Sequence, residues 1–256
     1  MDNHNVAAML KRRGFTLLSA NPEESLILPP NMEESLENEL YELLKKYSFR
    51  IVIRDVIKQR ESFGIADLLN YSTRECVEGY IAFLIGCGIV DTIGEGRFKL
   101  SATSLTSFGD TLEWFIAKVF EREFASPALW GVKLGGGKAG GDYDVVTSVE
   151  GRLVYVEVKS SPPKNVEEVE VVSFLKRVEE IIPSMAIFLE DTRLRMKDKI
   201  VPFFEGALRK KNLTVTRLHD ETFSTDNRLF ITNSAPDIVT NIGFCIQHHL
   251  KSEGFW

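Results

Sequence analysis

The spacing of apolar residues predicts that the first half of the chain is mainly helical. Residues 33–47 carry leucines about 3.6 residues apart, which puts them on one helix face, at Leu36, Leu40, Leu43 and Leu44. Acidic residues come early in this stretch and lysines late, as the helix dipole favours. Residues 51–60 and 65–69 have the same helical character over shorter lengths. We therefore expect three helical elements between residues 33 and 70.

A capped helix and a hairpin close this half. Ser72 and Glu75 have the spacing of a capping box, in which the two side chains satisfy free backbone amides at a helix start. Two short apolar runs then flank Gly94-Glu95-Gly96, a connection of the length that makes hairpins. Helix, short helix, capped helix and hairpin is the element order of a winged helix-turn-helix, and residues 67–100 resemble that family in spacing.

The second half changes to strands and helices in alternation. Residues 112–124 have the amphipathic pattern typical of a helix. Predicted strands then cover residues 129–134, 144–147, 153–159, 185–189, 213–218 and 228–231, and predicted helices cover 166–180, 196–211 and 236–251. A meander of strands followed by alternating helices and strands indicates an α/β fold with a mixed sheet flanked by helices.

Two carboxylates and an ammonium group fall on one face of neighbouring predicted strands. Glu157 and Lys159 point the same way, because side chains alternate along a strand. If Asp144 begins the partner strand of the hairpin, its carboxylate reaches the same face. Such a cluster is costly unless something pairs with it, and Mg²⁺ prefers oxygen ligands while it keeps several waters. The pattern therefore predicts a Mg²⁺ site, at which Mn²⁺ is expected to substitute.

Asp144 and the triplet Glu157-Val158-Lys159 resemble the motif of the PD-(D/E)XK nuclease superfamily, which has the restriction-endonuclease-like fold. By element order the resemblance covers residues 108–189. It implies that Asp144, Glu157 and the Val158 carbonyl hold Mg²⁺, and that Lys159 orients or deprotonates the attacking water. It also implies an outer carboxylate from Glu113, on the helix ahead of the motif. These roles agree with a metal ion that activates water and a lysine that stabilises negative charge.

The chain departs from that motif at one position and leaves alternatives open. Tyr143 precedes Asp144, where the motif has a proline. Asp142 competes with Asp144 for the aspartate role. An E-x-K triplet is also ordinary on a half-exposed strand, because charged and apolar residues alternate there. A nuclease fold that has lost its chemistry is therefore the alternative to an active enzyme.

Seven basic residues are candidate contacts for nucleic-acid phosphates. They lie beside a glycine-rich stretch, on the predicted wing and in the densest basic region of the chain: Lys133, Lys138, Arg97, Lys99, Arg193, Arg195 and Lys197. A flexible turn and a solvated surface are the alternatives for the first and last of these groups. The predicted recognition helix offers mainly acidic residues, so the winged helix is as well suited to a protein contact as to DNA.

Composition limits the partners and the compartment. The formal net charge of −6 and the pI near 5.4 argue against a broadly basic surface, so any nucleic-acid contact must be local. Three cysteines in 256 residues suit a reducing compartment better than a disulfide framework. The longest uncharged apolar run, residues 79–90, is shorter than the roughly 20 residues that a bilayer-spanning helix needs. We expect a cytoplasmic protein without a membrane partner.

Together these patterns predict a Mg²⁺-dependent DNA endonuclease. The expected organisation is an extension of unassigned role over residues 1–30, a winged helix-turn-helix-like domain over 31–105 and a PD-(D/E)XK nuclease-like domain over 106–256. The expected substrate is double-stranded or branched DNA, with RNA as an alternative, and cleavage of both strands would call for a homodimer. The competing hypothesis is a catalytically inactive DNA-binding or regulatory protein that uses the nuclease fold as a scaffold.

Overall fold

The computed structural model describes residues 4–102 and 104–252. It divides the chain into two compact units. The large unit contains the residues up to 22 and those from 112 onward, and the small unit contains residues 23–111. Part of the predicted N-terminal extension therefore packs with the second half of the chain. Whether residues 31–105 and 106–256 are separate functional domains stays a prediction.

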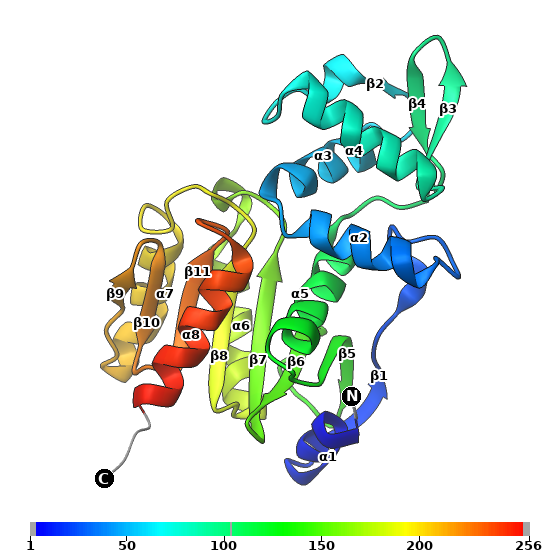
Figure 1. Cartoon of the computed structure of the whole chain (residues 1–256). Coiled ribbons are helices and arrows are strands. Elements are labelled where there is room, and N and C mark those ends of the chain that lie inside the picture. The colour runs from blue at the N-terminus through cyan, green and yellow to red at the C-terminus, as the bar shows by residue number, and fades with distance from the viewer. Residues whose placement is uncertain (1–3, 103, 253–256) are drawn as a thin grey trace. The chain divides into compact units, whose positions relative to one another are not determined.

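One mixed sheet of eight strands forms the centre of the large unit (Figure 1). In spatial order the strands are β1 (Thr16–Ser19), β5 (Ala128–Gly135), β6 (Tyr143–Val149), β7 (Arg152–Lys159), β8 (Met185–Glu190), β11 (Leu229–Asn233), β10 (Thr222–Thr225) and β9 (Thr216–His219). β8 runs parallel to both β7 and β11, and the other neighbours are antiparallel. The predicted α/β class with a mixed sheet is confirmed.

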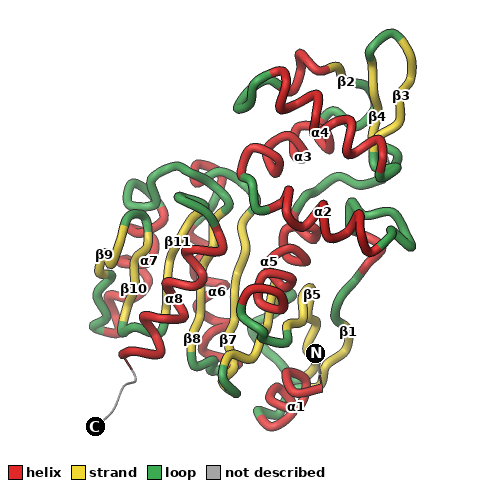
Figure 2. The backbone as a smooth tube through the Cα atoms, in the orientation of Figure 1, coloured by secondary structure: helices red, strands yellow, loops and turns green. Residues whose placement is uncertain are grey.

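Helices cover both faces of this sheet. They are α1 (His4–Arg12), α5 (Gly109–Glu123), α6 (Glu168–Ile181), α7 (Ile200–Leu208) and α8 (Ile238–Ser252), with short 3₁₀ turns at Pro163–Asn165 and Arg209–Lys211. Figure 2 shows α5 and α8 in front of the sheet and α6 and α7 behind it. Phe174 of α6 and Phe204 of α7 pack edge-on against Phe188 of β8, at ring-centroid distances of 5.5 and 5.3 Å. No helix within the described residues is long and apolar enough to cross a membrane.

The small unit contains helices and a three-stranded sheet. Its elements are a 3₁₀ turn (Glu23–Ser25), α2 (Glu34–Leu44), α3 (Tyr47–Lys58), β2 (Phe63–Gly64), a 3₁₀ turn (Ile65–Leu68), α4 (Arg74–Gly86), β3 (Val90–Gly94) and β4 (Arg97–Leu100). β4 lies between β2 and β3, and the β3–β4 hairpin occupies the predicted wing position. The element order predicted from sequence is present.

The start of α4 differs from the prediction by one residue. The N-cap is Thr73, whose backbone is extended and whose hydroxyl accepts a hydrogen bond from the Cys76 amide at 3.4 Å. The predicted pair of Ser72 and Glu75 is therefore wrong. Serine and threonine both suit the N-cap, and the backbone conformation at residue 73 selects the second of them.

Two strands of the eight-stranded sheet escape the hydrophobic pattern. β10 was not predicted, and β1 comes from the predicted extension and pairs antiparallel with β5, with Thr16 opposite Gly135. β1 is a short edge strand with mostly exposed side chains, so it lacks the alternation that reveals a strand. Asn21 then fixes the following turn, because its amide donates to the Trp130 carbonyl at 2.7 Å and its side chain accepts from the Trp130 amide at 3.0 Å.

Gly131 of β5 lies against Pro22, which follows Asn21 in this turn. Its φ of +55° is left-handed, and a Cβ there would come within 2.7 Å of the Pro22 ring. We expect Gly131→Ala to lower the free energy of unfolding of the large unit by about 3 kcal/mol, from left-handed strain and from overpacking. Gly151→Ala, also at positive φ but with no atom within 4 Å of its Cβ, is the matched control with an expected cost of about 1 kcal/mol.

Urea unfolding followed by tryptophan fluorescence measures both variants. Trp114 and Trp130 are buried in the large unit, and residues 23–111 contain no tryptophan, so the change in signal follows the large unit. Equal destabilisation by the two substitutions would contradict the close contact between Pro22 and Gly131.

Candidate active site

The β6–β7 hairpin brings Asp144, Glu157 and Lys159 together. Val145 pairs with Val156 in the antiparallel register, so Asp144 and Glu157 come next to each other on the two strands. An Asp144 oxygen accepts a hydrogen bond from the Val158 amide at 2.7 Å. Glu157 and Lys159 share one face of β7, where Lys159 Nζ lies 2.9 Å from Glu157 Oε1. Two carboxylates and an ammonium group therefore surround one point at the carboxyl end of β7.

Burial and mutual repulsion set the protonation of this trio. Glu157 has only 1% of its surface exposed. Loss of solvent, followed by the negative charge of Glu157, raises the pKa of Asp144 to about 8. Loss of solvent opposes the charge on Lys159, but Glu157 and Asp144 outweigh it and raise the pKa of that ammonium group. At neutral pH the lysine is charged, while much of Asp144 carries a proton.

Arg177 of α6 is a buried partner of this trio that the sequence analysis missed. Its Nη2 donates to both carboxylate oxygens of Glu157 at 2.8 Å, and its Nε donates to the Tyr155 hydroxyl at 2.9 Å. The Tyr155 hydroxyl in turn donates to Glu157. A sequence signal for Arg177 existed, because it interrupts the apolar stripe formed by Val171, Phe174 and Ile181 on α6.

Glu170, also on α6, supplies a second anchor for Lys159. One oxygen lies 3.3 Å from Lys159 Nζ, and the other accepts from the Glu167 amide at 2.9 Å in a capping box at the helix start. The E-x-x-E spacing of Glu167 and Glu170 was the available signal. Lys159 is therefore held between Glu157 of the sheet and Glu170 of the helix.

The glycine-rich loop between β5 and β6 rests on α6. Glu180 accepts hydrogen bonds from the amides of Lys138 and Ala139, the latter at 3.1 Å, and from the Tyr143 hydroxyl at 2.8 Å. Partial burial would raise the pKa of Glu180, but these donors outweigh it and lower the pKa. A Cβ at Gly137 would lie 3.0 Å from Glu180, so glycine lets the loop approach the helix. Tyr143, at the position of the motif proline, ties the loop to α6.

The other acidic candidates lie outside the trio. Asp142 is exposed and pairs with Lys133 at 3.6 Å, so Asp144, and not Asp142, joins Glu157. Glu113 lies on α5 beside β5, with Oε2 4.0 Å from the position of a Cβ on Gly131. Gly131 itself falls between the register pairs of Trp130 and Val132 with β6, next to Asp144. Glu113 thus occupies the sheet neighbourhood of the trio, as an outer carboxylate would.

The basic candidates occupy three different places. Arg97 and Lys99 belong to the small unit, where Arg97 pairs with Asp67 at 3.1 Å and Lys99 with Asp91 at 3.9 Å. Lys133 and Lys138 flank the glycine-rich loop beside the trio. The loop after β8 carries the remaining three, Arg193, Arg195 and Lys197. That loop begins beside Lys159, because Lys159 and Glu190, the last residues of β7 and β8, are register partners.

The donor atoms at this point fit an oxygen-preferring cation that keeps some of its water. Within residues 4–102 and 104–252 no cluster of three or more His, Cys, Asp or Glu side chains could hold a metal ion. Asp144 and Glu157 supply two carboxylates, and the Val158 carbonyl is the third oxygen that the motif implies. Such a sparse set suits Mg²⁺ or Mn²⁺, which are often held by one or two carboxylates, waters and substrate phosphates. Loss of solvent, and then the neighbouring charge of Glu157, raises the pKa of Asp144, and a bound cation would offset both effects.

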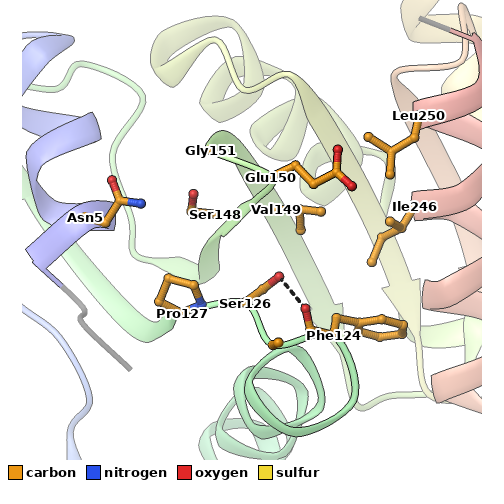
Figure 3. A pocket seen from close by; sticks show the side chains of 11 residues that line it. Asn5, Phe124, Ser126, Pro127, Ser148, Val149, Glu150, Gly151, Ile246 and Leu250 are labelled. Carbon is orange, nitrogen blue, oxygen red and sulfur yellow. Dashed lines mark hydrogen bonds between the residues drawn. The ribbon is translucent and has the colours of Figure 1, made fainter. Parts of the chain in front are cut away.

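A separate cavity of about 450 Å³ lies at the opposite end of the hairpin, by the β6–β7 turn. Figure 3 shows Asn5 of α1 and Leu250 of α8 on either side of Ser148, Val149 and Glu150. The cavity and the trio lie at opposite ends of β6 and β7, so this cavity takes no part in the site.

Comparison with solved structures supports the fold. Protein VC1899 from Vibrio cholerae superposes with a TM-score of 0.56 at 13% identity, over 97% of this chain and 62% of that chain. Can2 from Sulfobacillus thermosulfidooxidans, solved in complex with cyclic tetra-adenylate, gives a TM-score of 0.54 at 12% identity, over 94% of this chain and 60% of that chain. The chain spans about three fifths of the length of each. Searches against protein families and curated proteins find no match.

The raised pKa of Asp144 should make the stability of the protein depend on pH. Its folded pKa is about 8 against an ordinary value of 3.8, so between these values the folded state keeps a proton that the unfolded state has lost. Stability of the metal-free wild type should therefore fall as pH rises from about 4 to 8 and level off above. We expect Asp144→Asn to remove this dependence and to raise the free energy of unfolding at pH 7 by at least about 1 kcal/mol.

Urea unfolding with chelator at pH 5, 6.5 and 8 measures this gain. Asp142→Asn, at the exposed aspartate two residues away, is the control, for which we expect almost no change. Equal pH slopes in the wild type and Asp144→Asn would show that Asp144 is ionised throughout.

Proposed function

We propose that the chain is a metal-dependent nuclease that hydrolyses phosphodiester bonds in DNA. The observation that carries this proposal is the convergence of Asp144, Glu157 and Lys159 at the end of one hairpin in a mixed sheet. The two carboxyl groups are adjacent, and loss of solvent followed by the charge of Glu157 raises the pKa of Asp144 to about 8. Perturbed carboxylates of this kind concentrate at functional sites.

The residues that would hold Mg²⁺ are Asp144 and Glu157, through their carboxylates, and Val158, through its carbonyl. When bound, the ion would lower the pKa of a coordinated water and offset negative charge on the phosphate. Asp144 must give up its proton to coordinate a cation. The Val158 amide holds the Asp144 side chain against β7 at 2.7 Å, so its orientation is set in advance.

Lys159 would bind the scissile phosphate as an ammonium group. Its pKa is raised, so it stabilises negative charge and orients the attacking water instead of removing a proton from it. A Glu170 oxygen on α6 lies 3.3 Å from Lys159 Nζ. This contact would keep the ammonium group in place when Glu157 binds the cation. Glu113 would act as an outer carboxylate near β5.

The glycine-rich loop and the loop after β8 would contact the substrate backbone. Lys133 and Lys138 bring positive charge close to the trio, and Arg193, Arg195 and Lys197 extend it from the next strand along the sheet edge. In the small unit Arg97 already donates hydrogen bonds to Asp67 and Ser62. These contacts hold β4 in place, so Arg97 has a structural role apart from any contact with DNA. Double-stranded or branched DNA is the substrate we propose, with a homodimer for cleavage of both strands.

Cleavage of a nucleic-acid panel tests the proposal. We expect the wild type to cut at least one of plasmid, linear, branched or single-stranded DNA with Mg²⁺ or Mn²⁺. Glu157→Gln and Lys159→Met should each lower the rate by at least about 10²-fold, the usual cost of one electrostatic contact in a transition state. Glu150→Gln, in the turn at the far end of the hairpin, is the control with an expected rate near that of the wild type.

RNA and cyclic tetra-adenylate belong in the same panel. The second is the ligand in the Can2 structure and is itself a phosphodiester, so it serves here as both a trial substrate and a trial activator. DNA binding without cleavage under either metal would favour the scaffold hypothesis over the nuclease. Undiminished cleavage by both site variants would place the chemistry elsewhere.

Lys138 provides a test of substrate binding apart from cleavage. Its main-chain amide is held by Glu180, so its side chain extends from a fixed loop. We expect Lys138→Ala to weaken DNA binding and to reduce the slope of log affinity against log salt by about 0.9, the value for one lost phosphate contact. Lys176→Ala, at an exposed lysine of α6, is the control, and fluorescence anisotropy between 50 and 200 mM salt is the measurement. An unchanged slope would remove Lys138 from the binding surface.

A further inference from the structure

Arg177 is a buried cation whose contacts reach both the acidic site and the loop beside it. Only 9% of its surface is exposed. Its Nη2 binds Glu157, its Nε binds the Tyr155 hydroxyl, and its Nη1 points to the Gly140 carbonyl at 3.5 Å. The three nitrogens of the guanidinium group therefore face two acceptors on β7 and one on the glycine-rich loop.

The surroundings hold this guanidinium group in one orientation. Phe174, one helical turn earlier on α6, packs on the Tyr155 ring at 5.5 Å, and the Tyr143 ring meets Tyr155 edge-on at 5.3 Å. On the loop side a Cβ at Gly141 would lie 3.0 Å from Arg177 Nη1, so the absence of a side chain there leaves room for the arginine.

Glu157 depends on this arrangement for its own orientation. Its carboxylate receives hydrogen bonds from Arg177 and Tyr155 and an ion pair from Lys159, which together engage both oxygens. Of these partners Lys159 is the most exposed, with 20% of its side chain accessible, whereas Arg177 of α6 and Tyr155 of β7 are buried. If a cation displaced Lys159, the Glu157 carboxylate would therefore still be held by Arg177 and Tyr155.

We propose that Arg177 is a positioning residue, which fixes the Glu157 carboxylate for a divalent cation and links it to the glycine-rich loop. The inference rests on the proposed function. Carboxylates that bind metals are themselves held by hydrogen bonds, and loss of such a partner typically lowers metal affinity by about 10 to 100-fold. The shape of the guanidinium group is part of this role, because its separate nitrogens donate to Glu157 and Tyr155 at the same time. A lysine could keep the charge but not both hydrogen bonds.

Direct binding of Mn²⁺ to the full chain tests this role without any need for cleavage. Free Mn²⁺ is followed by electron paramagnetic resonance for the wild type, Arg177→Lys, Arg177→Gln and Lys176→Gln. We expect both Arg177 variants to bind Mn²⁺ at least about 10-fold more weakly than the wild type. Lys176→Gln removes a positive charge from the neighbouring, exposed position of α6 and should leave the affinity unchanged.

Thermal unfolding with chelator separates a loss of fold from a loss of metal. A folded Arg177→Lys protein with wild-type affinity would overturn the inference. So would tighter binding by Arg177→Gln, because Arg177 would then be only a cation that competes with the metal. If neither variant folds, Tyr155→Phe is measured instead. Weaker Mn²⁺ binding by this variant supports the inference that Arg177 and Tyr155 together position Glu157, and unchanged binding overturns that inference.

The same titration distinguishes this inference from the proposed function. A wild type that binds no Mn²⁺, or an Asp144→Asn variant that binds it equally well, overturns the metal site and the role of Arg177 with it. Weak binding by Asp144→Asn together with unchanged binding by both Arg177 variants keeps the nuclease proposal and removes only the positioning role.

Discussion

Two carboxyl groups packed next to each other at the end of one hairpin are the constraint on which the rest of the site depends. Asp144 and Glu157 are neighbours on β6 and β7, and loss of solvent around them favours the protonated form of Asp144. The protein offsets this cost with four donors: the Val158 amide on Asp144, and Lys159, Arg177 and the Tyr155 hydroxyl on Glu157. Removal of one partner from a buried charge is costly, so the elements that carry these partners must stay in register.

Helix α6 supplies several of the side chains that hold the site and the loop beside it. Glu170, Arg177 and Glu180 lie seven and three residues apart on α6, which places them along one side of the helix. The first holds Lys159, the second holds Glu157, and the third holds the amides of the glycine-rich loop. Phe174 and Val171 on the same helix are buried against the sheet. The hydrophobic stripe of α6 therefore fixes where its polar side chains can reach.

Packing these groups together at the site costs stability. The loop that borders it approaches α6 so closely that Gly137 and Gly141 leave no room for a Cβ without displacing Glu180 or Arg177. Asp144 keeps a proton near neutral pH, although an ionised carboxylate is what a metal ion requires. Local sequence choices that look unfavourable for folding are expected where a protein performs chemistry.

The sequence determined the α/β class, the β6–β7 hairpin and the trio, because strand alternation and one short turn suffice to place Asp144 near Glu157 and Lys159. Only the tertiary structure decided that Asp144 and not Asp142 joins them: strand alternation would put both on one face, but Asp142 precedes β6 and pairs with Lys133, whereas Asp144 lies beside Glu157. It also decided the roles of Arg177, Glu170 and β1. Their partners lie on other helices or strands, and no local period encodes which residue a buried guanidinium group or an edge strand will meet.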